Sequence, residues 1–450
     1  MLDTVIRNLK VLRAGVWTAV DVGIESGKIA EITSQVTGSA RSEVIAEGQF
    51  AMSGAVDLHV HFNEPGRTNW EGFKTGSAAA AAGGVTTVAE MPLNSIPSTV
   101  TVDALDQKLA AIKGKSSVDY ALWGGVVPGN VDSLEALADA GVVGFKAFMS
   151  PSGTDDFDNS DVATLREAMR RIARTGLRLA LHAEDPHVLK AAEAKLGQKE
   201  TALDWEASRP VSAEVSAVQI AIELSVETGC PITIVHVSSP EVLAVIDAAK
   251  AKGVDILAET CPHYLLLNIG QADAIGPVAK CAPPLRSEAT VSELRAAVLS
   301  GRIDTIGSDH SPSSPDLKEG LSFYKAWGGI SGLQHGLPLT LDMLGMDLGL
   351  TGQCLEGVFS AKPASVAGMS AKGQLTVGAD ADLVLFEQRE MPAMIQKSDL
   401  LYRHPFSAYI GCSSRVVVAS TWLRGVCIYK EGAILSAPTG RFINCAELRK

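Results

Sequence analysis

The chain has 450 residues, of which 46% are hydrophobic and 20% charged, and its formal net charge is −12. This is the balance of a globular protein with room for one large domain and one or two smaller ones. The acidic charge argues against a nucleic-acid partner, which would need a basic face, and no apolar run is long enough to predict a membrane span.

The seven cysteines are widely spaced, odd in number and include no Cys-x-x-Cys pair. Neither a disulfide framework nor a zinc ribbon is therefore predicted, and a reducing compartment is expected. Residues 1–15 alternate apolar and polar side chains and lack the apolar core of a signal peptide. We therefore expect a cytoplasmic protein.

Short alternating runs at both ends of the chain predict β-strands. Residues 1–50 contain "DTVIRNLKVL" and "SEVIAEGQFA", with the turn "ESGK" between two further runs. Residues 374–450 repeat this pattern in "GADADLVLFE" and "SRVVVASTWLRGVCIYKEG". Neither end is large enough to form a stable sheet alone. We therefore predict that the two ends pair into one small composite β-sandwich domain.

Residues 51–373 follow a different pattern, in which short β-branched runs alternate with amphipathic or alanine-rich segments. Such alternation predicts parallel strands joined by helices, and eight units predict an α/β fold, the (β/α)8 TIM barrel. A doubly wound open sheet is the alternative, which the strand count disfavours. The eight predicted strands are residues 55–61, 84–91, 118–126, 142–149, 177–183, 231–238, 254–261 and 302–309, and helix candidates include 132–141, 161–176 and 240–253.

Polar, metal-ligating side chains stand at the carboxyl ends of these predicted strands. Those ends meet at one face of a barrel, where barrel enzymes place their chemistry. A single histidine at a strand end is usually a hydrogen-bonded polar residue with no role as a ligand. Asp309 alone could cap the next segment. Several such residues at the same topological position instead predict a metal site, because imidazole and carboxylate suit a divalent ion such as zinc. The predicted ligands are His59, His61, His182, His236 and Asp309.

Lys146 belongs to the fourth strand and allows two interpretations. Its ammonium group could reach the rim or pair with a carboxylate, since a buried cation beside metal ions is costly. A desolvated, neutral amine could instead react with CO2 to form a carbamate, N6-carboxylysine, whose two oxygens can bridge two metals. The pattern of residues leaves both interpretations open.

Several motifs resemble the cyclic amidohydrolases of the amidohydrolase superfamily, a group that contains hydantoinases, dihydropyrimidinases, dihydroorotases and allantoinases. The motifs are "DLHVHFNEPG", "GFKAFMSP", "LALHAED", "IVHVSS", "AETCPHYL", "CAPPLR" and "GSDHSP", and the resemblance covers nearly the whole chain. It implies a homotetramer and two divalent metal ions, Zn2+ first and Co2+, Mn2+ or Fe2+ as alternatives. It also implies the ligand assignment: His59, His61 and Asp309 on one metal, His182 and His236 on the other, and carboxylated Lys146 between them.

Within this group, the loops "NEPGRTNWEGFKTGS", "EMPLNSIPSTV" and "KAWGGISGLQHGLP" resemble the allantoinase branch. Asn63 stands where dihydroorotases usually carry arginine, and Phe157 is the nearest aromatic residue where hydantoinases usually carry tyrosine. The resemblance implies hydrolysis of the hydantoin-ring amide of allantoin to allantoate, in purine degradation. The alternatives are a hydantoinase or dihydropyrimidinase that opens another ring, and a non-catalytic homologue, which the complete ligand set disfavours.

The resemblance also suggests roles for residues around the metals. Asp309 would be the catalytic residue, accepting a proton from water and passing it to the leaving nitrogen. Substrate contacts are expected from Asn94, which could equally be a turn residue, and from backbone groups at Ala282 and Gly328.

Four further residues are given alternatives rather than roles. Asp57 could accept a hydrogen bond from an imidazole or lie in the barrel floor. Glu259 and His263 could support the site or be purely structural, with His263 expected to orient its loop. Arg67 is expected to be an ion-pair partner in the loop that follows His61, with a substrate contact as the alternative.

Overall fold

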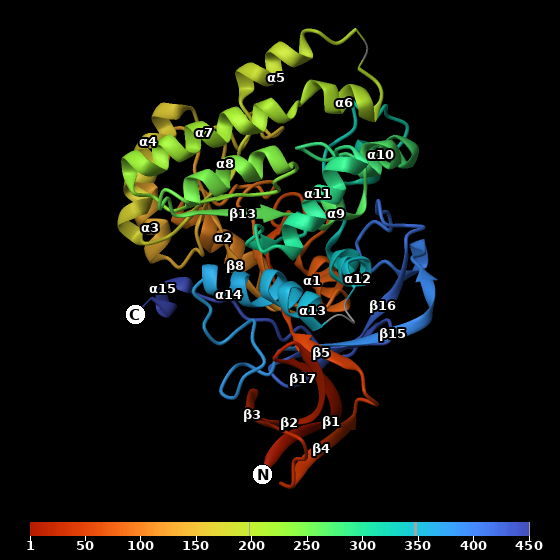
Figure 1. Cartoon of the computed structure of the whole chain (residues 1–450). Helices are drawn as coiled ribbons and strands as arrows, with labels where there is room; N and C mark the ends of the chain where they lie inside the picture. Colours follow the sequence, from red (N-terminus) through yellow and green to blue (C-terminus); the bar gives the residue numbers. More distant parts are fainter. Residues whose placement is uncertain (198, 346–348, 450) are drawn as a thin grey trace.

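The computed structural model describes residues 1–197, 199–345 and 349–449. Its larger part is a barrel of parallel strands surrounded by helices, and its smaller part is a β-sheet domain below the barrel in the view of Figure 1. All eight strands predicted for residues 51–373 are present, the third in two pieces. They are β6 (Ala55–Val60), β7 (Val85–Glu90), β8 (Asp119–Leu122), β9 (Gly124–Gly125), β10 (Phe145–Phe148), β11 (Leu179–His182), β12 (Ile232–Ile234), β13 (Ile256–Thr260) and β14 (Thr305–Ile306).

The barrel closes through two junctions. Strands β6 to β8 form one sheet and β9 to β14 another, with all pairs parallel. At the first junction Val143 N donates to Leu122 O at 2.9 Å, which joins the two sheets beside Trp123. At the second, His61 N donates to His310 O at 2.8 Å, next to a parallel bridge between Val60 and His310. The predicted TIM barrel is therefore confirmed, and the open sheet is excluded.

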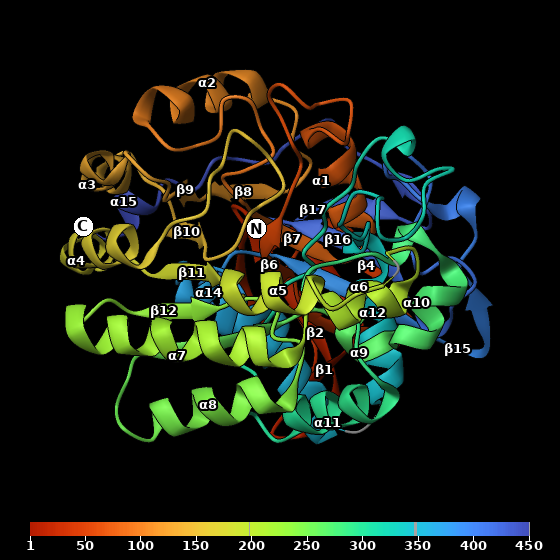
Figure 2. The same cartoon turned by 90° about the horizontal axis from the view of Figure 1, so that it is seen from above.

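Helices surround the strands, as the view from above in Figure 2 shows. Helix α4 (Val162–Thr175) illustrates why they form where they do: Asp161 caps its first turn by accepting from Thr164 N, and Gly176 ends it with φ of 71°. The other barrel helices are α1 (Phe73–Ala82), α2 (Val102–Ile112), α3 (Leu134–Asp139), α7 (Val211–Thr228), α8 (Pro240–Lys250), α11 (Glu288–Leu299) and α12 (Leu333–Leu344). Further helices are α5 (Pro186–Glu193), α6 (Ala202–Ser208), α9 (Pro262–Leu266), α10 (Ile269–Ile275), α13 (Gly349–Glu356), α14 (Lys362–Val366) and α15 (Cys445–Leu448).

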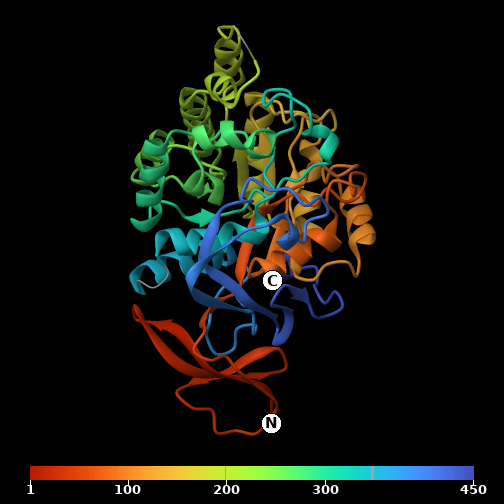
Figure 3. The ribbon, with the colours of Figure 1, turned by 90° about the vertical axis from the view of Figure 1, so that its right-hand side faces the viewer.

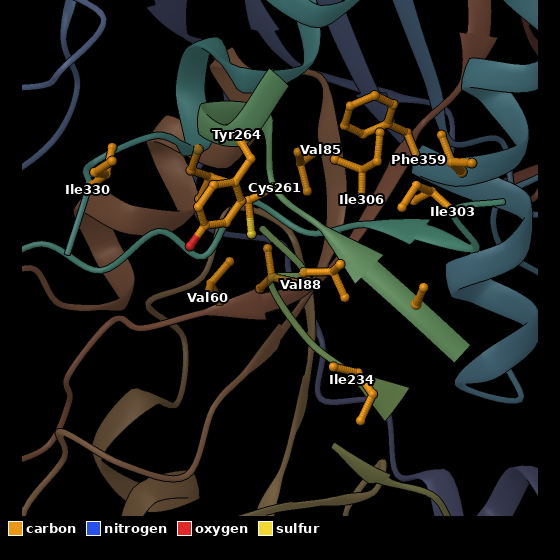
Figure 4. Packing of buried hydrophobic residues seen from close by; sticks show 14 of the residues in the cluster. Val60, Val85, Val88, Ile234, Cys261, Tyr264, Ile303, Ile306, Ile330 and Phe359 are labelled. Atoms are coloured by element: carbon orange, nitrogen blue, oxygen red, sulfur yellow. The ribbon is translucent and has the colours of Figure 1, made fainter. Parts of the chain in front are cut away.

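The barrel strands also bury aliphatic side chains. Val60, Val88, Ile234 and Ile306, which are each at most 2% exposed, belong to one core cluster (Figure 4). Burying one such side chain contributes about 1.5–3 kcal/mol to folding. The metal-ligating candidates, by contrast, lie at the strand ends, where a pocket opens.

The small domain is built from both ends of the chain. Its nine strands follow the order β18-β17-β16-β15-β5-β1-β2-β3, and β4 pairs with β1. The antiparallel pairing of β5 with β15 joins the two ends and confirms their predicted association (Figure 3). The boundaries at residues 50 and 374 stay a prediction. The strands are β1 (Leu2–Arg13), β2 (Val16–Glu25), β3 (Lys28–Thr33), β4 (Ala40–Ile45), β5 (Phe50–Ser53), β15 (Leu383–Met394), β16 (Ser413–Leu423), β17 (Val426–Lys430) and β18 (Ala433–Ile434).

Within the described ranges, no helix has both the length and the apolar character needed to cross a bilayer.

Candidate metal centre and active site

A pocket of about 330 Å³ opens at the carboxyl ends of the barrel strands. It brings together side chains as far apart in the sequence as those of His59 and Trp327. The convergence of the strand-end residues follows from parallel strands ending at one face. All six residues predicted as ligands line it: His59, His61, Lys146, His182, His236 and Asp309.

The first cluster joins the ends of β6 and β14. The Oδ1 atom of Asp309 lies 3.4 Å from Nε2 of His59 and 3.3 Å from Nε2 of His61. On the opposite side of its ring, His59 donates from Nδ1 to Oε1 of Glu259 at 2.6 Å. That donation leaves the lone pair of His59 on Nε2, facing Asp309. This is the arrangement of a metal-ligating histidine with a supporting carboxylate.

The second cluster lies at the ends of β11 and β12. The Nδ1 atom of His182 faces Nε2 of His236 at 3.0 Å. His182 uses its other nitrogen, Nε2, to donate to Oε2 of Glu184 at 2.7 Å. The Nδ1 atom of His182 therefore accepts from Nε2 of His236 in this contact. A shared cation would take the place of that proton, and the His236 proton would then be on Nδ1.

Glu184 and Arg209 are site residues that were not predicted. The Arg209 guanidinium pairs with Glu184, which is fully buried, and also lines the pocket. Burial acts to raise the pKa of Glu184, but Arg209 and His182 outweigh it and lower that pKa to about 2. Glu184 repeats the two-residue spacing of His59 and His61, and that spacing was the available signal; nothing in the sequence pointed to Arg209.

Lys146 lies in the same pocket with its amine unsatisfied. The side chain is 1% exposed, and no hydrogen-bond partner of Nζ is present in the described part of the chain. Burial lowers the pKa of Lys146 to about 8. The interpretation in which Lys146 reaches the rim or pairs with a carboxylate is therefore wrong. An orphaned, buried amine is what carbamate formation requires.

The protonation states suit metal binding. Burial lowers the pKa of His61 to about 4 and also lowers those of His182 and His236, so these imidazoles are neutral at pH 7. Burial opposes ionisation of Asp309, but the neighbouring His59 and His61 outweigh it and hold the pKa of that carboxyl below its usual range. Neutral imidazoles around one carboxylate form a donor set for a borderline-soft divalent cation.

Asp57 does not have one of its two predicted roles, that of a hydrogen-bond acceptor for an imidazole. Its carboxylate accepts from the backbone N of His59 at 3.0 Å and of Ser308 at 3.1 Å, and no imidazole bonds to it in the described residues. The imidazole acceptor is Glu259 instead. Asp57 thus ties the backbone of β6 to that of the segment after β14, and its burial raises its pKa to about 6.

Three other residues considered in the sequence have contacts of different kinds in the structure. Arg67 forms the expected ion pair, with Asp156 at 2.9 Å. His263 is fully buried in α9, and neither ring nitrogen has a hydrogen-bond partner among the described residues, so its loop-orienting role stays a prediction. Asn63 is buried and donates from Nδ2 to Pro312 O at 3.2 Å; it does not line the pocket.

The wall of the pocket contains the three predicted substrate-contact positions, Asn94, Ala282 and Gly328. It also contains aromatic and cationic residues that were not predicted. Trp205 donates from Nε1 to Cys281 O at 2.8 Å, and Nζ of Lys280 lies 3.9 Å from the centre of the Trp205 ring. Trp205 lies in α6 and Lys280 in a loop, both beyond the strand ends, so the strand pattern did not point to either of them.

Fold and site together define a TIM-barrel protein whose strands end at a pocket lined by histidines and an aspartate that could hold a metal ion. Residues 50–427 match the sequence model of the amidohydrolase family. The chain belongs to the amidohydrolase family.

Similar proteins are found over the whole chain. A protein named allantoinase from Rubrobacter xylanophilus is 46% identical over 98% of this chain and 97% of its own length. Another allantoinase, from Bacillus velezensis, is 41% identical over 100% and 99%. Among solved structures, the L-hydantoinase (dihydropyrimidinase) from Arthrobacter aurescens has a TM-score of 0.94 at 33% identity, covering 99% of this chain and 100% of that one.

Proposed function

We propose that this protein is an allantoinase, which hydrolyses the hydantoin-ring amide of allantoin to give allantoate. The observation that carries the proposal is the match, at 46% identity and almost end to end, to a relative of that name. The pocket supports it, because a site for cyclic-amide hydrolysis needs metal donors and a proton acceptor within one cavity.

The donor set fits two divalent cations, of which Zn2+ is the first choice. In the proposed assignment, His59, His61 and Asp309 hold one ion, and His182 and His236 hold the other. Lys146, carboxylated on its amine, would be a ligand of both. Support comes from the facing nitrogens, the short contacts to Asp309 and the unsatisfied Lys146 amine. When bound, such ions polarise a carbonyl and make water acidic enough to attack it.

Residues of the chain perform the remaining tasks. Asp309 accepts the proton of the attacking water and delivers it to the ring nitrogen that leaves, so one carboxylate acts first as base and then as acid. Its low pKa keeps it ionised before each cycle. Glu259 and Glu184 hold the rings of His59 and His182 in their ligating orientation.

The substrate ring is proposed to lie against Asn94, Ala282 and Gly328, which line the same pocket as the donors. Backbone groups at the last two positions can hydrogen-bond the alternating N–H and C=O groups of a hydantoin. The homotetramer implied by the family resemblance is part of the proposal, and light scattering of the purified protein tests it.

A hydantoinase or dihydropyrimidinase is the second candidate, favoured by the TM-score of 0.94 to a protein of that name. A non-catalytic homologue is disfavoured because every predicted ligand lies in the pocket.

The test is a substrate panel with zinc-loaded protein: allantoin, hydantoin, dihydrouracil and dihydroorotate, with ring opening followed by liquid chromatography and mass spectrometry. We expect allantoin to open fastest, and an Asp309→Asn variant to be inactive on every ring. If hydantoin or dihydrouracil opens while allantoin stays intact, the second candidate replaces the first.

A further inference from the structure

Two buried lysines, one that lines the pocket and one behind its wall, hydrogen-bond backbone carbonyls. Lys280 is 4% exposed and Lys318 is 3% exposed. Nζ of Lys280 donates to Tyr324 O at 2.6 Å and to Ala326 O at 2.7 Å. In the part of the chain that the structure describes, neither lysine forms an ion pair with a carboxylate.

Lys318 makes three such contacts. Its Nζ donates to Trp327 O at 2.8 Å, Gly329 O at 2.9 Å and Pro277 O at 3.3 Å. All three ammonium hydrogens therefore have carbonyl acceptors. Together the two lysines donate hydrogen bonds to five backbone carbonyls, which belong to residue 277 and to the segment 324–329. We call this arrangement the lysine clasp.

Burying an ammonium group without a counter-charge is unfavourable, because carbonyl dipoles replace only part of its hydration. The same cost lowers the pKa of both groups. Burial, and next to it the charge of Lys280, lowers the pKa of Lys318 to about 7. Burial and the charge of Arg209 lower the pKa of Lys280 to about 8. Such a costly arrangement points to a role beyond general stability.

The clasp holds together two backbone segments that form one wall of the pocket. Gly329 N donates to Lys280 O at 2.7 Å, and Trp327 N donates to Leu317 O at 2.9 Å. Residues 280–282 and 325–329 line the pocket side by side. Gly328, which lies inside the clasped segment, and Ala282, two residues beyond Lys280, are the positions proposed to contact the ring.

We propose that Lys280 and Lys318 are positioning residues, which fix the backbone groups at Ala282 and Gly328 in the geometry that binds the ring of the substrate. This inference rests on the proposed function for the identity of the ring. Lys318 is the sharper probe, because it does not line the pocket and so acts only through the wall. Lys280 lines the pocket, so its replacement also changes the surface that the substrate meets.

The test compares Lys318→Met, Lys318→Arg and a control, Lys252→Met, in the zinc-loaded enzyme. Lys252 is exposed and lies just after α8, away from the pocket. For Lys318→Met we expect KM for allantoin to rise by about tenfold, which corresponds to the loss of about one hydrogen bond between the pocket backbone and the ring. The kcat should change much less, because the metal ligands are untouched. Lys318→Arg should recover part of the loss, since guanidinium N–H groups can reach some of the same carbonyls.

Metal content distinguishes positioning from general destabilisation. It should be the same in all the variants, and a KM equal to that of the wild type in Lys318→Met would overturn the proposal. A loss of metal parallel to the loss of activity would overturn it as well.

Hydrogen exchange provides a readout that does not depend on the substrate. In the holoenzyme, peptides covering residues 324–329 should exchange faster in Lys318→Met than in the wild type, whereas peptides from β6 and β11 should not. Unchanged exchange at 324–329 would show that the clasp does not order the wall. If another ring of the panel opens in place of allantoin, the KM comparison is made with that ring. The proposed function would then fail while the clasp is still tested.

Discussion

Glu259 accepts a hydrogen bond from Nδ1 of His59 at 2.6 Å, across 200 residues of sequence. Both side chains are at most 4% exposed, so water does not compete with this bond. The bond fixes the ring orientation and places the lone pair on Nε2, toward Asp309. Metal affinity should therefore depend on a residue that does not itself face the metal position.

Replacing Glu259 tests this dependence. We expect Glu259→Ala to weaken zinc binding by about 10–100-fold, because loss of a supporting carboxylate has effects of that size. The zinc affinity of Glu259→Gln should lie between those of the wild type and Glu259→Ala, because the amide oxygen still accepts from Nδ1 of His59. Competition with a chromophoric chelator measures the affinity. The control is Glu241→Ala, which removes an exposed carboxylate and should bind zinc like the wild type.

The unsatisfied Lys146 amine leads to a prediction about CO2. Zinc reconstitution of metal-free protein should be faster and more complete when bicarbonate is added, because a carbamate forms on the neutral amine before it bridges. Lys146→Ala should bind at most one zinc per chain and show no bicarbonate effect. Native mass spectrometry should detect one added carboxyl group in the wild type alone. Full activity and two bound zinc ions in Lys146→Ala would contradict the bridging role.

The pair formed by Glu184 and Arg209 predicts how stability varies with pH. The pKa of Glu184 falls from 4.5 to about 2 on folding, so its stabilising contribution is present above pH 4.5 and is lost as the pH falls toward 2. Arg209→Met leaves a buried carboxylate without its partner, and we expect the free energy of unfolding at pH 7 to fall by about 3–5 kcal/mol. Near pH 3 the difference from the wild type should shrink, because the variant can protonate Glu184 at small cost.

Urea unfolding of the metal-free proteins at pH 3 and pH 7 measures both values. Arg166→Met is the matched control, since Arg166 pairs with Glu227 at the surface, where both side chains are about 40% exposed. Its effect should stay below about 1 kcal/mol at either pH. An equal loss for Arg209→Met at the two pH values would mean that Glu184 is not the group responsible.

A fourth prediction concerns the loop that follows His61. Glu90 accepts from the backbone N of Phe62 at 3.0 Å and of Asn63 at 2.9 Å, and it pairs with Lys108 at 2.8 Å with both side chains fully buried. Lys108→Met should lower the free energy of unfolding by about 3–5 kcal/mol, because it leaves the buried carboxylate of Glu90 without its counter-charge. Adding Glu90→Gln to that variant should restore much of the loss, since the amide oxygen still accepts from both N–H groups. Urea unfolding checks the pair of variants, and a double variant that is less stable than Lys108→Met alone would contradict this account.

Much of the metal centre could be predicted because it follows from strand periodicity. Alternate residues of a strand point the same way, so His59 and His61 had to face one side together. Parallel strands joined by helices end at a common face, so His182, His236 and Asp309 could be placed beside them without any knowledge of their contacts. The ends of the chain could be predicted to associate, because neither had strands enough to be stable alone.

The neighbours of these residues could not be predicted in the same way. Asp57 and Glu259 are both acidic strand residues near histidines, and only the tertiary structure shows that Glu259 reaches the His59 ring while Asp57 bonds to backbone. Arg209, Lys280 and Lys318 lie in or beside loops, and a loop has no period that links a residue to its partner.

The sequence by itself therefore determined the barrel, the pairing of the two ends and the residues that meet at the carboxyl-end face, because these depend on repeating local patterns. Only the tertiary structure decided which carboxylate supports which imidazole, that the Lys146 amine is left unsatisfied, and that two lysines clasp the pocket wall. Those relationships depend on distances of a few ångströms between segments far apart in the chain, and such distances exist only after the loops have packed.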